Sequence, residues 1–124
     1  MLAQYRSRPT FAKWRDDLLQ LYVEHGTYRR EDGSLELKCS GEVEGAMFSH
    51  SGSLGVWDVL PKIKTPVLVI HGETTEGFLS MVAEQVASRV QNGRRETVDE
   101  AGHLAPMEQP EVVADRVLAF LRDA

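Results

Sequence analysis

The fold is decided by residues 66–73, which read PVLVIHGE. A proline followed by four β-branched or aliphatic residues and closed by glycine is typical of a short strand buried on both faces. The loop that follows carries Glu73 and Glu76, so we expect both carboxylates at the carboxyl end of this strand. Sites in open parallel sheets are built at that edge.

A helix and a second strand are predicted after this loop. Apolar residues recur at every fourth position and indicate a helix that buries one stripe and ends at Asn92-Gly93. The members of this stripe are Phe78, Val82, Val86 and Val90. Residues 94–98 predict a short, polar strand. A strand–helix–strand unit of this kind forms a right-handed crossover in a parallel sheet.

A single histidine lies between the second strand and a last helix. Residues 101–110 read AGHLAPMEQP, and the helix predicted over residues 109–121 has one apolar face. That face consists of Val113, Val117, Phe120 and Leu121. Gly102 permits a tight turn directly before His103, and Pro110 suits the first turn of the helix. A loop between rigid elements often presents a catalytic base, although His103 could also only pack a turn.

These two stretches resemble the last third of an α/β-hydrolase-fold enzyme. In that family the catalytic acid follows the penultimate strand, and the catalytic histidine follows the last strand, with Glu-x-Pro downstream. The resemblance implies that His103 is the general base, which takes a proton from the nucleophile and later delivers one to the leaving group. It implies a partial α/β-hydrolase fold, in which a helical cap segment precedes a β-α-β-α unit with parallel strands.

The identity of the acid stays open at this point. The family usually has an aspartate three or four residues after the glycine that ends the strand, where this sequence has Thr75 and Glu76. Glu73 follows that glycine directly. A glutamate can serve, because the acid only orients the imidazole and offsets its charge. Glu76 is the first choice and Glu73 the second, and the alternative is that both are solvated loop residues.

The Gly-x-Ser-x-Gly pentapeptide that carries the family's nucleophile does not occur in this sequence. The nearest match, residues 51–55, reads SGSLG and has Ser53 at its centre. Residues 42–50 do not predict a buried strand before it, and Pro61 leaves little room for the helix that follows a nucleophile elbow. A flexible Gly/Ser connector is the preferred interpretation.

The N-terminal half resembles the cap insertion of a subset of bacterial hydrolases in this family. Residues 11–25 predict a helix that ends at Gly26 and shares one apolar face, made by Trp14, Leu18, Leu21 and Tyr22. Asp32-Gly33 predicts a hairpin turn between residues 27–29 and 35–37, with Cys39 on the inward face. Caps of this kind shape the substrate pocket.

The chain is therefore expected to have three parts. Residues 1–48 form the cap-like segment with its hairpin, residues 49–65 a linker with a short helix, and residues 66–124 the β-α-β-α part of a hydrolase core. The resemblance implies hydrolysis of a carboxylic ester or a related bond in a small-molecule substrate, with this chain supplying cap, acid and histidine. An aspartate nucleophile on the same scaffold would cleave epoxides or carbon–halogen bonds, and the alternative is a non-catalytic fragment or interaction domain.

Two parallel strands cannot bury residues 67–70 on both faces and leave no open edge. We therefore expect another polypeptide to cover that edge. The resemblance implies that this is the missing N-terminal hydrolase segment, which would also carry the nucleophile and the oxyanion-binding amides. The alternative is a second copy of the chain.

Composition excludes several other classes of function. The net charge is −5 and no basic cluster occurs, which argues against a nucleic-acid partner. The four histidines lack HxH or HExxH spacing, and no glycine-rich phosphate loop occurs, so no metal or cofactor is predicted. The single cysteine, Cys39, allows no internal disulfide. No apolar run of membrane length and no signal-peptide pattern occur, which predicts a cytoplasmic protein without a membrane partner.

Overall fold

The computed structural model describes residues 2–50 and 55–123, which belong to two compact units. The N-terminal unit covers residues 1–54 and the C-terminal unit residues 55–124. Ser53, the nucleophile candidate of the SGSLG stretch, lies outside the described residues. None of the helices in the described ranges has both the length and the apolar character needed to cross a membrane.

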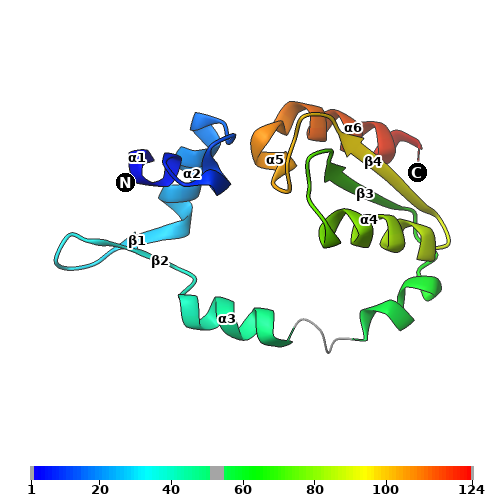
Figure 1. Cartoon of the computed structure of the whole chain (residues 1–124), viewed down its shortest axis with the longest axis horizontal. Helices are drawn as coiled ribbons and strands as arrows, with labels where there is room; N and C mark the ends of the chain where they lie inside the picture. Colours follow the sequence, from blue (N-terminus) through cyan, green and yellow to red (C-terminus); the bar gives the residue numbers. More distant parts are fainter. Residues whose placement is uncertain (1, 51–54, 124) are drawn as a thin grey trace. The chain divides into compact units, whose positions relative to one another are not determined.

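The C-terminal unit has the predicted strand–helix–strand–helix order (Figure 1). Two short 3-10 helices come first, and a single-turn helix that the sequence did not predict precedes the last helix. The elements are η3 Val56–Asp58, η4 Leu60–Lys62, β3 Val67–Gly72, α4 Phe78–Arg89, β4 Gly93–Val98, α5 Ala105–Glu108 and α6 Pro110–Asp123. As expected, Pro110 opens the last helix, where its missing N–H costs nothing.

Strands β3 and β4 form a parallel pair in register from Val67 and Gly93 to Gly72 and Val98. Figure 1 shows α4 and α6 on either side of this pair. Two ion pairs agree with that placement, because neighbouring strand residues point to opposite faces. Arg95 bonds Glu84 of α4 at 2.7 Å. The next residue, Glu96, bonds Arg116 of α6 at 2.8 Å.

The core at the carboxyl end of the strands lies on the α6 side. Val98, Ala101 and Ala105 are almost completely buried, and Ile70 and Val113 pack against them. Two of these residues, Ala101 and Ala105, flank the loop that carries the predicted histidine. The hydrophobic core therefore anchors that loop on both sides of residue 103.

Burial predictions for this unit were wrong at Phe78, which is 68% exposed, and at Leu121 of α6, which is 64% exposed. Residues 67–71 of β3 are half-buried, as expected for two strands by themselves. A two-stranded sheet offers too little surface to cover these side chains within the unit. The predicted helix stop at Asn92-Gly93 was also wrong, since α4 ends at Arg89. Gly93 instead allows β4 to pass α4, because a Cβ there would lie 2.0 Å from the carbonyl oxygen of Ala87.

The N-terminal unit is a helical segment with one β-hairpin. Its elements are α1 Leu2–Arg6, η1 Pro9–Phe11, α2 Asp16–Gly26, β1 Thr27–Arg29, β2 Leu35–Leu37 and α3 Gly41–His50. The predicted hairpin is confirmed: β1 and β2 pair antiparallel, and Gly33 has a positive φ of 82° in the turn. Across the hairpin, hydrogen bonds from Arg30 and then from Tyr28 lower the pKa of the Glu36 carboxyl.

The predicted helix over residues 11–25 begins later than expected, at Asp16. Phe11 belongs to the preceding 3-10 helix, because Pro9 fixes the backbone there. The buried face also differs from the prediction: Leu19 is 2% exposed, whereas Leu21, expected inside, is 46% exposed. Cys39 is exposed rather than inward, since β2 ends at Leu37 before reaching it.

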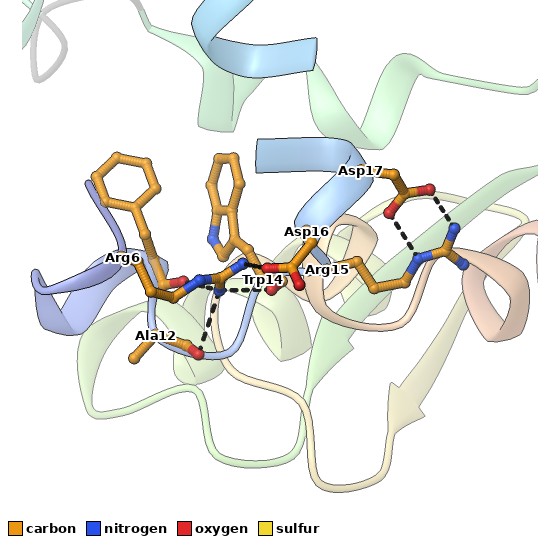
Figure 2. Close-up of polar contacts among 7 residues, drawn as sticks. Arg6, Ala12, Trp14, Arg15, Asp16 and Asp17 are labelled. Atoms are coloured by element: carbon orange, nitrogen blue, oxygen red, sulfur yellow. Dashed lines mark hydrogen bonds and ion pairs between the residues drawn. The ribbon is translucent and has the colours of Figure 1, made fainter. Parts of the chain in front are cut away.

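The core of this unit is a cluster of four aromatic rings with centroids 4.9–5.8 Å apart. The rings belong to Tyr5, Phe11, Trp14 and Tyr22. One arginine fixes the turn beneath them (Figure 2). Arg6 Nη1 donates to the carbonyl oxygens of Phe11 at 2.7 Å and Trp14 at 2.6 Å, and its Nη2 bonds the carboxylate of Asp16. A single guanidinium thus connects α1, η1 and the start of α2.

Candidate active site

The loops predicted to carry the acid and the histidine leave the same edge of the sheet, because β3 and β4 are parallel. Hydrogen bonds donated by Glu73 and Thr74 join them. The amide of Glu73 donates to the carbonyl of Val98 at 2.9 Å. The amide and the hydroxyl of Thr74 both donate to the carbonyl of Ala101, at 2.9 and 3.0 Å. The structure therefore confirms that the two loops meet.

This close approach depends on a residue without a side chain at the end of β3. A Cβ at Gly72 would lie 2.1 Å from the carbonyl oxygen of Gly102 and 2.3 Å from that of Ala101. Both are backbone atoms, which cannot rotate away. Gly72 thus allows the histidine loop to pass directly over the end of β3.

Glu73 is already engaged in holding the loops together. Its Oε2 accepts a hydrogen bond from the amide of Glu100 at 2.8 Å. Glu100 has a φ of 59°, a left-handed conformation that residues with a side chain rarely adopt. The Glu73 carboxylate therefore supports a strained turn directly after β4.

Glu76 differs from Glu73 because none of the described residues binds its carboxylate. Its side chain is exposed and makes no hydrogen bond or ion pair within residues 2–50 and 55–123. The preceding Thr75 is buried, and its hydroxyl has no partner in the described part of the chain. Of the two predicted acids, Glu76 is the one whose carboxylate is available.

His103 projects from an anchored loop. Its side chain is exposed, whereas Ala101 is 0% and Ala105 2% exposed. No hydrogen bond joins the imidazole to Glu73 or Glu76 in the described residues. The structure brings the backbones of the two loops together, and the contact between imidazole and carboxylate stays a prediction.

Two residues of the site were missed as site residues by sequence reasoning. Glu108 Oε2 accepts a hydrogen bond from the amide of Gly102 at 2.8 Å, and Gln109 Nε2 donates to the carbonyl of Asp99 at 2.7 Å. The Glu-x-Pro pattern pointed to these positions without indicating what they contact. Both side chains bind the backbone of the loop that carries His103.

The described residues hold no group of three or more histidine, cysteine or acidic side chains that could bind a metal ion. A hollow of ≈ 300 Å³ lies beside Pro66 and Gly93, at the amino ends of the strands and away from His103. What the carboxyl edge presents is an exposed imidazole on a fixed loop with one unengaged carboxylate on the neighbouring loop. These groups suit general base catalysis.

No protein-family model matches the sequence. The crystal structure of E-2-(acetamidomethylene)succinate hydrolase superposes with a TM-score of 0.79 and covers 99% of this chain and 44% of the hydrolase, at 17% identity. The chain has an α/β-hydrolase fold. The predicted fold class, with a β-α-β-α unit of parallel strands after a helical segment, is thereby confirmed.

Sequence relatives agree with the α/β-hydrolase fold. The chain is 43% identical over 63 residues to the carboxylesterase YbfK of Bacillus subtilis (strain 168), a match that covers 50% of this chain and 21% of the esterase. It is 31% identical over 103 residues to a putative 2-succinyl-6-hydroxy-2,4-cyclohexadiene-1-carboxylate synthase of the same organism, covering 82% of this chain and 37% of the synthase. The chain thus spans well under half the length of these relatives.

Proposed function

We propose that this chain supplies the catalytic histidine and acid of an α/β-hydrolase that cleaves a carboxylic ester or a related bond in a small molecule. The observation that carries the proposal is the placement of His103. Its imidazole is exposed between two buried anchors, at the edge where the loop with Glu76 also leaves the sheet. The similarity to a carboxylesterase over 63 residues favours ester substrates.

In the proposed reaction, His103 carries the proton. A hydroxyl nucleophile from outside this chain attacks the ester carbonyl carbon while the neutral imidazole accepts its proton. The tetrahedral intermediate collapses, the carbon–oxygen bond to the alcohol breaks, and the imidazolium protonates the leaving alkoxide. A water molecule then repeats the sequence on the acyl-enzyme, with His103 again accepting and returning one proton.

Glu76 is the acid in this proposal. Its role is to fix the imidazole tautomer and to offset the positive charge that forms on His103. Glu73 is the weaker candidate, because its carboxylate already binds the amide of Glu100. The N-terminal unit takes the role of the cap segment in this proposal.

The missing partner in this proposal is the N-terminal segment of a hydrolase core, which pairs with the free edge of β3. In the described residues β3 pairs only with β4, and residues 67–71 remain half-buried. The chain covers 44% of the hydrolase structure that it matches, so more than half of that structure has no counterpart in this chain. A second copy of this chain at the same edge is the alternative.

A chromogenic ester tests the proposal, with the chain assayed alone and mixed with the protein encoded immediately upstream. We expect activity only on mixing, and a loss of about a thousandfold or more in His103→Ala. Glu76→Gln should lose most of the activity. Glu73→Gln is the matched control, because its amide oxygen can still accept from Glu100. Full activity in His103→Ala would refute the assignment.

A non-catalytic interaction domain with the same fold is the second candidate. The observation that favours it is the lack of a Gly-x-Ser-x-Gly pentapeptide. Inactivity both alone and on mixing would support this candidate. Activity of the chain alone, abolished by Ser53→Ala, would instead assign the nucleophile to the SGSLG stretch.

A further inference from the structure

We propose that Glu108 is a positioning residue, whose carboxylate holds the backbone from which His103 projects and so sets where the imidazole lies. This inference rests on the proposed function, because it concerns the same histidine. It assigns a role to a side chain that does not itself reach the reacting atoms.

The first observation is a hydrogen bond that closes the loop around the histidine. Glu108 Oε2 accepts from the amide of Gly102 at 2.8 Å, and Gly102 directly precedes His103. A bond to a charged acceptor is stronger than one between neutral groups. The residue next to the imidazole is therefore held by a carboxylate rather than by solvent.

The second observation is that hydrogen bonds fix the backbone of the residue that carries this carboxylate. The amide of Glu108 donates to the carbonyl of Leu104 at 3.1 Å, and that of Gln109 donates to the carbonyl of Ala105 at 2.8 Å. Ala105 is almost completely buried at the start of this turn. The backbone of α5 and the side chain of Glu108 thus form a closed ring that contains residue 103.

A second hydrogen bond closes a larger ring of the chain around the first ring. Gln109 Nε2 donates to the carbonyl of Asp99 at 2.7 Å, directly after β4. The loop from residue 99 to residue 104 is therefore tied to the junction of α5 and α6 at two points. With its backbone held in this way, His103 retains chiefly the rotations of its own side chain.

The side chain of Glu108 also lies close to the Cα of Gly102. A Cβ at position 102 would lie 3.0 Å from Oε1 and 3.5 Å from Oε2 of Glu108. The carboxylate of Glu108 thus packs closely against the backbone of Gly102. A neutral side chain without an acceptor oxygen at position 108 would leave the amide of Gly102 without this partner.

Three variants test the inference in the mixed enzyme with a chromogenic ester. Glu108→Ala removes the acceptor and Glu108→Gln keeps an acceptor oxygen. Asp115→Ala removes an exposed carboxylate of α6 that makes no hydrogen bond or ion pair within the described residues. We expect Glu108→Ala to lower kcat by about tenfold to a hundredfold with KM little changed, because small displacements of a catalytic group are costly. The acidic limb of the pH profile should also move.

Glu108→Gln should recover most of the rate and the original pH profile, and Asp115→Ala should match the unmodified enzyme. A purely structural role would reduce the amount of active enzyme without moving the pH profile. An unchanged kcat and pH profile in Glu108→Ala, or a Glu108→Gln variant as impaired as Glu108→Ala, would overturn the inference.

Hydrogen exchange of the Gly102 amide in this chain gives a readout that does not depend on activity. We expect exchange to speed up in Glu108→Ala and to stay slow in Glu108→Gln. Unchanged exchange in Glu108→Ala overturns the inference. If His103→Ala is fully active, the proposed function fails. If His103→Ala is inactive while Glu108→Ala behaves as unmodified, only the positioning role fails.

Discussion

The position of His103 is decided by the residues around it. Ala101 and Ala105 are small enough to enter the core on either side, and the imidazole between them is left exposed. Gly72 lets this loop cross the end of β3, and Glu108 binds it from the other side. The histidine loop is therefore shaped by close backbone contacts rather than by the histidine itself.

Gly72→Ala should destabilise the C-terminal unit. The new Cβ would lie 2.1 Å from a carbonyl oxygen of the histidine loop, and only separation of the two loops could relieve that clash. We expect a loss of about 1–3 kcal/mol, as for other overpacked sites. Native-state hydrogen exchange of the β3 and β4 amides measures it.

Gly45→Ala is the matched control for this substitution. Gly45 lies within α3, and apart from the backbone of its own helix no atom of the described residues lies within 4 Å of an added Cβ. Alanine is also the better helix former, by up to about 1 kcal/mol. Equal effects of Gly45→Ala and Gly72→Ala on β3–β4 exchange would contradict the steric explanation.

At the scale of the elements, ion pairs explain how a polar stretch forms a strand. Residues 93–98 read GRRETV, and Arg95 and Glu96 reach the helices on opposite faces of the sheet. In the N-terminal unit one side chain connects several elements. Arg6 binds the carbonyl groups of Phe11 and Trp14, which lie just before α2.

Arg6→Ala should destabilise the N-terminal unit by about 1–3 kcal/mol, because charged hydrogen bonds to two carbonyl groups are lost. Trp14 fluorescence during urea denaturation reports the change, in a Trp57→Phe background that removes the second indole. Arg6→Lys should recover only part of the stability, since an ammonium lacks the planar fork of a guanidinium.

Arg8→Ala is the control for Arg6→Ala. Arg8 lies over the ring of Tyr5 at 5.6 Å, a contact worth about 0.5–1 kcal/mol at exposed sites. Its removal should therefore cost less than that of Arg6. Equal midpoints for the two variants would rule out the turn-fixing role of Arg6.

At the scale of the whole molecule, the C-terminal unit leaves apolar surface uncovered. Large side chains of α4 and α6 are exposed, and β3 has a free edge in the described residues. The most exposed of these side chains are Phe78, Met81, Leu118 and Leu121. Surface of this kind marks an interface when it is contiguous.

Sedimentation velocity should therefore show concentration-dependent self-association of the isolated chain, and a complex with one copy of each chain after mixing with the upstream protein. Free strand edges and exposed apolar side chains both favour association. A monodisperse monomer over the whole concentration range, unchanged by mixing, would contradict the predicted cover at the β3 edge.

The sequence by itself determined the fold class and the order of the two strands and two long helices in the C-terminal unit. The PVLVIHGE stretch, the glycine before His103 and the Asp32-Gly33 turn each act within a few residues, so their consequences can be read locally. The resemblance to hydrolases then identified the edge at which His103 and the two glutamates lie. The structure confirms that the loops meet there.

Only the tertiary structure decided which groups are engaged and which are free. Glu73 binds Glu100, Glu108 binds Gly102, and Phe78 faces solvent, and no local pattern distinguishes these outcomes. The physical reason is that each depends on atoms brought together from separate loops or on surface that two strands cannot cover. Periodicity predicts that a residue lies on a face, and the packing of the whole unit decides what that face meets.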